Sequence, residues 1–174
     1  MIPEQGILQF SSAQRNLVFQ ALDEAEERTT AYYCIPPFRW EQLRYDVLTQ
    51  ADHGYEPLPA SMLARVRCLQ RIHRSRPFDF FRIELNDCRI LAAAFEEDLI
   101  KCLYPFLVYI LTHEMVHMIR LTSILDNWIQ TLPPFDESEE KRVQTISRRI
   151  LSDSLNFQSV LDRFCVKDRS AATR

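Results

Sequence analysis

The sequence predicts an α+β fold in which helices predominate. Only two of the 174 residues are glycine, which argues against a glycine-rich phosphate loop, a Rossmann fold or a fold built from many hairpins. Glutamate, arginine and leucine are frequent, and they favour helix. Apolar residues recur every three or four positions through most of the longer segments. Residues 80–95 instead suggest a small β-sheet or hairpin, placed just before the most apolar helix of the chain.

The first half of the chain is predicted to form three helices. Ser11 or Ser12 caps a first helix that runs to about Arg28. Pro37 suits the first turn of a second helix, which would bury Trp40, Leu43, Val47 and Leu48. Residues 52–59 are the clearest loop. A third helix over residues 60–75 would have at helical spacing Met62, Leu63, Val66, Leu69 and Ile72.

The second half begins with the predicted strands. Residues 80–85 and 89–95 read as two short strands joined by a turn, although the alanine run in the second suits a helix equally well. A helix starts near Pro105, and a last helix spans about 136–151, with a further piece reaching Phe164. Residues 1–166 are predicted to be a single domain and residues 167–174 a polar tail.

One motif carries the most chemical information. His113, Glu114 and His117 form an H-E-x-x-H pattern inside an apolar segment. On a helix, residues four apart share one face, so both imidazoles can reach a single metal ion. Glu114 lies about 100° around the helix, close to a water on that metal rather than to the metal itself. The pattern is typical of a zinc site with an adjacent general base.

The alternative is that the two histidines only form hydrogen bonds in a core. Residues 106–111 and 118–119 are almost wholly apolar, so the helix is predicted to be buried nearly all round. A buried helix rarely carries two histidines and a glutamate unless they are paired or bind metal. The sequence therefore favours the metal site.

A catalytic zinc usually takes three protein ligands. The metzincin class would place a histidine six residues after His117, but Ser123 stands there, and no cysteine follows within forty residues. A carboxylate on the last helix remains. Asp136 and Glu139 have the spacing of a capping box, so Glu140 is predicted as the third ligand and Glu139 as the second choice. A solvated acidic first turn is the alternative for this run.

These residues resemble the gluzincin type of H-E-x-x-H zinc metallopeptidase, including its compact, uncharacterised bacterial members. The likeness covers residues 80–150 and rests on His113, Glu114, His117 and Glu140. It implies a zincin-like domain with a short sheet, Zn2+ as cofactor and a peptide or protein as substrate. The chain departs from the family pattern at Val143 and Gln144, where alanine and an acidic residue or asparagine are usual.

The implied reaction is hydrolysis, with Glu114 activating a zinc-bound water that attacks a peptide carbonyl. Candidates to stabilise the oxyanion are His53, His73, Tyr104 and Tyr109. Two alternatives remain: a non-catalytic zincin-like module that binds metal for a structural or regulatory role, or a helical protein in which the motif is accidental. The oligomeric state is not predicted.

Other features narrow the classes of partner. The net charge is −3, and the densest basic run, residues 65–76, reads as the solvated face of a helix rather than a nucleic-acid surface. Five widely spaced cysteines without a C-x-x-C pair are typical of reduced, mostly buried thiols in a cytoplasmic protein. No signal peptide is visible, and residues 103–111 are too short to cross a membrane.

Overall fold

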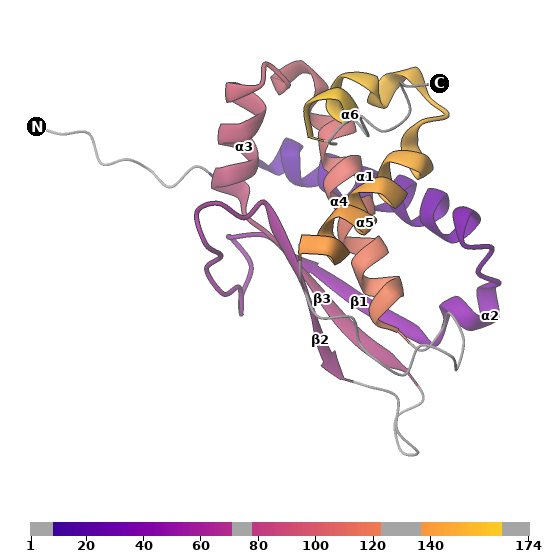
Figure 1. Ribbon diagram of the computed structural model, residues 1–174. Helices are drawn as coiled ribbons and strands as arrows, with labels where there is room; N and C mark the ends of the chain where they lie inside the picture. The colour runs from indigo at the N-terminus through magenta and orange to yellow at the C-terminus, as the bar shows by residue number, and fades with distance from the viewer. Residues whose placement is uncertain (1–8, 71–77, 123–136, 165–174) are drawn as a thin grey trace, which may run out of the picture.

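A computed structural model describes residues 9–70, 78–122 and 137–164. Within these residues the chain is α+β and mostly helical, as predicted. Three strands form one small sheet beside a group of helices, and the buried hydrophobic residues make one cluster between them (Figure 1). The predicted polar tail at 167–174 lies outside the described residues.

Helix α1 (Ser12–Tyr32) begins where the sequence indicated. The Ser11 side chain accepts a hydrogen bond from Gln14 N, and the Gln14 side chain accepts one from Ser11 N. This capping box satisfies two amides that the first helical turn leaves unpaired. One face of α1, including Val18, Ala21 and Ala25, is buried against α4.

The predicted second helix is wrong beyond its first turn. Only α2 (Pro37–Trp40) is helical, and the chain then forms strand β1 (Leu43–Leu48). Leu43, Tyr45 and Val47 pack on the core. They alternate along the chain, so their spacing of two decides the structure, whereas Leu43 and Val47 taken alone also fit a helix.

The predicted third helix is also wrong, because strand β2 (Ala64–Gln70) occupies its centre. Ala64, Val66 and Cys68 point toward the core. The alternate residues Arg65 and Arg67 lie on the other face. The arginines therefore do not form the solvated face of a helix, and residues 71–77 of the basic run lie outside the described part.

Strand β3 (Asp79–Leu85) confirms the first predicted strand and lies in the middle of the sheet. It pairs in parallel with β1 and antiparallel with β2. The second predicted strand is instead helix α3 (Asp87–Glu96), whose first turn is capped by the Asn86 side chain accepting from Arg89 N. The cap and the alanine run together favour the helix.

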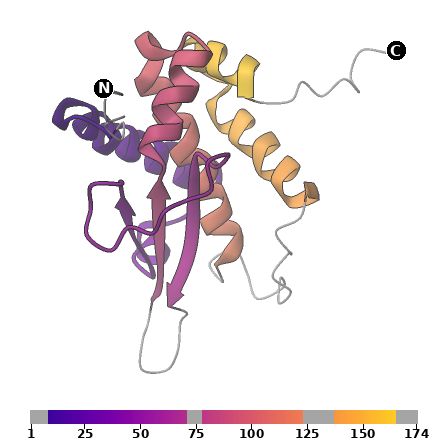
Figure 2. The same cartoon turned by 90° about the vertical axis from the view of Figure 1, so that its left-hand side faces the viewer.

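Helix α4 (Leu103–Leu121) is the central element, and it begins close to Pro105 as predicted. It contacts α1, β2, α5 (Glu137–Leu151) and α6 (Gln158–Phe164). The two views show it lying between the sheet and α5 (Figures 1 and 2). Short 3-10 turns, η1 (Ile100–Cys102) and η3 (Leu155–Phe157), precede α4 and α6.

Two further sequence expectations can be compared with the fold. The segment Ile100–Leu121 is long and apolar enough to cross a membrane, but 78% of its most apolar window is buried inside the protein. Buried core helices pass the same test, so this is weak evidence for a membrane span. Cys34, Cys68, Cys88 and Cys102 are free thiols, but Cys34 is exposed and the other three are half-buried, so the expectation of mostly buried thiols is wrong for them.

Candidate metal centre

Helix α4 holds the two histidines of the motif on one face. His113 and His117 are one helical turn apart, and their ring centroids are 4.8 Å apart. Their Nε2 atoms are separated by 3.2 Å, and both side chains are largely buried. The burial of α4 on nearly every side fixes these rings, since α1, β2, α5 and α6 all pack against it.

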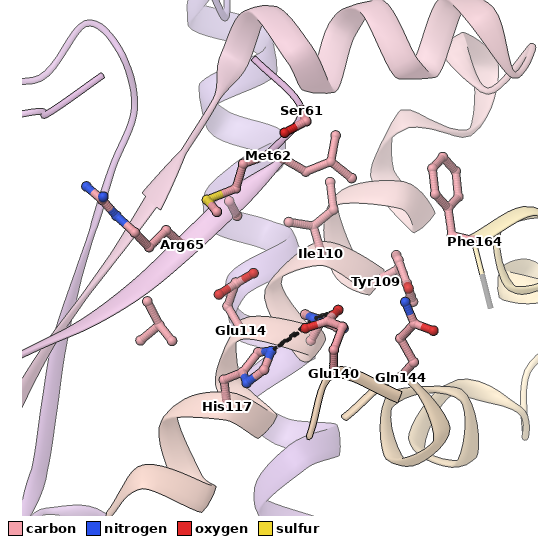
Figure 3. Close-up of a pocket in the computed structure, with 14 residues that line it drawn as sticks. Ser61, Met62, Arg65, Tyr109, Ile110, Glu114, His117, Glu140, Gln144 and Phe164 are labelled. Carbon is pink, nitrogen blue, oxygen red and sulfur yellow. Dashed lines mark hydrogen bonds and ion pairs between the residues drawn. The ribbon is translucent and has the colours of Figure 1, made fainter. Parts of the chain in front are cut away.

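Helix α5 brings Glu140 to the same point, as predicted. One oxygen of its carboxylate lies 3.0 Å from His113 Nε2, and the other lies 3.1 Å from His117 Nε2. Figure 3 shows Glu140 reaching across from α5 to His117 on α4. The three ligand atoms all lie within 4.8 Å of one another. We call His113, His117 and Glu140 the triad.

The triad fits a zinc ion in chemistry and in size. Two neutral imidazoles and one carboxylate are a known ligand set for catalytic zinc. Ligand atoms 2.0–2.1 Å from a tetrahedral ion are about 3.3 Å from each other. Here the two Nε2 atoms are 3.2 Å apart, and each lies 3.0–3.1 Å from a different oxygen of Glu140. The same separations also suit hydrogen bonds between imidazole and carboxylate, so the fit supports a metal without requiring it.

Glu139, the second choice for the ligand, points elsewhere. Its side chain is buried and accepts two hydrogen bonds from the Arg120 guanidinium, one of them 3.0 Å from Nη2 to Oε2. This ion pair fastens α5 to α4 beside the triad. The predicted capping partner, Asp136, lies outside the described residues. The pairing of Arg120 with Glu139 was not predicted, because the two residues are far apart in the sequence and lie on different helices.

Glu114 stands apart from the triad on the side of α4 that faces β2. Its side chain is buried, and the nearby backbone N–H of Val66 acts to lower the pKa of its carboxyl group. Burial raises the pKa of Glu114 above its ordinary value, although the neighbouring His113 and His117 act in the opposite direction. A carboxyl group whose pKa is raised toward neutrality is suited to accepting and returning a proton.

The charges of the triad are coupled in the metal-free protein. Hydrogen bonds with His113 and His117 hold the pKa of Glu140 far below its usual range. Burial of the His113 ring lowers its pKa, but the hydrogen bond with Glu140 and the charges of Glu114 and Glu140 outweigh it, so the pKa of His113 is raised from 6.5.

Zinc binding should therefore weaken early on acidification. Zinc needs the unprotonated ring of His113, and the raised pKa keeps the proton in place at a higher pH than in a free histidine. As the pH falls from 8 to 6, we expect the zinc Kd to rise by about tenfold per pH unit for each proton displaced, beginning above pH 6.5. Competition with a chelating dye measures the Kd, and circular dichroism checks the fold. A Kd that stays constant over this range would contradict the assignment.

A cavity of about 610 Å³ opens beside the triad, a volume within the usual range for ligand sites. All three triad residues and Glu114 line it, together with residues 61–66 and Tyr109, Ile110, Gln144 and Phe164. The contribution of residues 61–66 to the cavity was not predicted, because these residues were expected to form a helix. The alternation of Ala64, Val66 and Cys68 was the signal that could have found it.

The candidates for oxyanion stabilisation differ in their distance from the triad. Tyr109 lines the cavity, with its ring centroid 6.2 Å from that of His113. Tyr104 donates its hydroxyl to Glu24 of α1 and does not line the cavity. His53 is exposed in the loop before β2, and His73 lies outside the described residues. Of the described candidates, Tyr109 alone is placed near the triad.

Comparison with protein families, with curated proteins and with solved structures finds no match to the chain. We therefore infer the chemistry of the site from its own residues.

Proposed function

We propose that the protein is a zinc-dependent hydrolase of the metallopeptidase type. One observation carries the proposal: His113, His117 and Glu140 converge from two helices, and Glu114 lines the same cavity without joining them. A metal and a separate base at one cavity are the two parts that hydrolysis of an unactivated carbonyl requires.

In this proposal the triad, Glu114 and Tyr109 have different roles. His113, His117 and Glu140 would hold the ion, which supplies a Lewis acid and lowers the pKa of water. Glu114 takes the proton of the attacking water and passes it to the leaving amine. The burial that raises the pKa of Glu114 favours both halves of this transfer. Tyr109 is the described side chain best placed to donate to the developing oxyanion.

The position of β2 supports a peptide as the substrate. β2 is an edge strand, and among the described residues no strand pairs with its outer side. Leu63 O accepts a hydrogen bond from Asn86 N, just after β3. Backbone groups of alternate residues face the same way along a strand, so those of Ala64 and Val66 face the open edge beside the cavity that both residues line. An extended peptide can pair with such an edge and bring a carbonyl to the metal.

A second candidate function is a metal-binding module without catalysis. The closeness of Glu114 to the Val66 N–H favours it, because this contact would serve equally to hold α4 against β2. A structural zinc, however, is normally closed by four protein ligands. The cluster found among the described residues has three, which leaves a position for water and favours the hydrolase.

Removal and return of the metal tests the proposal. A strong chelator should abolish cleavage of a mixed peptide library, and about one equivalent of Zn2+ should restore it, because the ion supplies the Lewis acid. Product release is followed by mass spectrometry. A chelator-treated sample kept without added metal controls for slow damage. Cleavage that survives chelation, or a zinc-loaded protein that cleaves no peptide, would contradict the hydrolase.

A further inference from the structure

The cavity is chemically divided. Most of its polar side chains gather around the triad, with Glu114 and Gln144 beside it, whereas Ser61 and Arg65 lie apart from the triad. An apolar part extends along α4 toward α6 and the chain before β2. Figure 3 shows Met62 and Ile110 beyond Glu114, and Phe164 on the far side next to Tyr109. A substrate held at the triad therefore meets an apolar surface as soon as it extends away from the metal.

The apolar part is built from three separate elements. Met62 and Leu63 come from the chain leading into β2, Ile110 comes from α4, and Phe164 ends α6. Ile110 is buried, whereas Met62 is 37% exposed. Phe164 stacks on Phe106 with ring centroids 4.6 Å apart, and this contact fixes the wall that it forms. The surface is thus assembled by the fold rather than by one loop.

The charges around this part disfavour an acidic group. Among the described lining residues, Arg65 is the sole lysine or arginine. Its guanidinium donates to the buried Glu84, 2.6 Å from Nη2 to Oε2, and lies 3.6 Å from Glu56. Figure 3 shows the Arg65 side chain directed away from the triad. The pair with Glu84 keeps this cation on the outer face of the sheet, so it does not offer a counter-charge in the cavity.

We propose that this apolar part binds a large apolar side chain of the substrate, of the size of leucine or phenylalanine, next to the bond at the triad. The proposal rests on the proposed hydrolase function for the position of that bond. Burial of an apolar side chain against Met62, Leu63, Ile110 and Phe164 removes apolar surface from water. A pocket of this kind discriminates by size, and a single methylene group is worth about 10-fold or more in specificity.

Binding to the metal-free protein tests the pocket without any activity. The probes are N-acetyl-leucinamide, N-acetyl-phenylalaninamide, N-acetyl-alaninamide and the amide of N-acetyl-aspartate. We expect methyl resonances of Met62, Leu63 and Ile110 to shift and saturate at lower concentrations of the leucine and phenylalanine probes than of the alanine probe. The Leu69 methyls, on β2 but outside the cavity, are the internal control. Equal responses to all four probes, or none, would overturn the proposal.

Cleavage specificity gives the second readout. Among peptides that differ at one position next to the cleaved bond, kcat/KM should be highest for leucine or phenylalanine, lower for alanine and lowest for aspartate. Met62→Ala should reduce the preference for leucine over alanine several-fold. Leu69→Ala, a matched change at a 44% exposed residue of β2 that does not line the cavity, should leave the preference intact. An unchanged preference in Met62→Ala would count against the proposed pocket.

The two readouts separate this inference from the hydrolase proposal. Selective binding of the apolar probes without cleavage of any peptide supports the pocket and contradicts the hydrolase. Cleavage that is indifferent to the neighbouring side chain, together with unselective probe binding, supports the hydrolase and overturns the pocket.

Discussion

Replacement of Glu114 by glutamine should abolish most hydrolysis while leaving the metal in place. The amide cannot accept the proton of the attacking water, and general-base catalysis commonly contributes 10²–10⁴ in rate, so kcat should fall on the order of 10² or more. Zinc content should be unchanged, because Glu114 does not belong to the triad. The measurements are peptide-cleavage kinetics and elemental analysis of the same sample.

The variant is informative because glutamine preserves the structural contact of Glu114. The amide oxygen of glutamine can still face the Val66 N–H that lies near the carboxylate. Thermal unfolding should therefore resemble that of the native protein, apart from the effect of removing a buried carboxylate. Glu114→Gln with native kcat would show that the cleavage came from another group, and the metal-binding module would then be the better account.

Replacement of Glu140 by alanine should remove most of the zinc affinity. Two imidazoles that approach within 3.2 Å remain, but a catalytic zinc normally needs a third protein ligand. Glu140 is about half exposed, so its loss should disturb the core little. Isothermal titration of the metal-free variant with Zn2+ measures the change, with the fold checked by circular dichroism.

Glu139→Ala is the matched control, one residue away in the same helical turn. It should keep one zinc per protein but lose stability on the order of 3 kcal/mol, because Arg120 is left largely buried without its carboxylate partner. If Glu139 were only a helix cap, its loss would cost about 1 kcal/mol of unfolding free energy. Denaturant unfolding therefore distinguishes a capping role from the ion pair with Arg120. Loss of zinc in Glu139→Ala with retention in Glu140→Ala would reverse the ligand assignment.

The sequence predicted the candidate site better than it predicted the strands around it. The placement of His113 and His117 follows from helix geometry alone, since residues four apart in a helix must share a face. Glu140 required the further idea that a carboxylate on the last helix returns to α4, and the helix α5 does bring it there. Their roles as ligands stay predictions until a metal is measured.

The strands β1 and β2 carry the alternation of a strand, but this alternation did not exclude helices, because short apolar runs suit both periods. Val66 and Leu69 fit a helix by their spacing of three, whereas Ala64 and Val66 fit a strand by their spacing of two. The choice is made by tertiary pairing: β3 supplies backbone partners to both neighbours, and Glu84 pairs with Arg65 and Arg67 across the sheet. Neither partner can be identified from the local sequence.

The position of Glu114 shows why this error matters for function. With residues 60–75 taken as a helix, the short sheet before the motif was expected from residues 80–95 alone. The structure instead places β2 at an edge of the sheet, with Ala64 and Val66 lining the cavity beside Glu114. The proposed peptide substrate thus depends on a strand that was predicted as a helix.

X-ray absorption at the zinc edge, combined with a crystal structure of the zinc-loaded protein, would show directly whether the triad binds zinc. We expect one ion bound by Nε2 of His113, Nε2 of His117 and a carboxylate oxygen of Glu140, at about 2.0–2.2 Å, with a fourth position free of protein ligands. An ion bound elsewhere would contradict zinc binding by the triad. So would a zinc-saturated protein in which His113 and Glu140 keep their hydrogen bond and no ion lies between them.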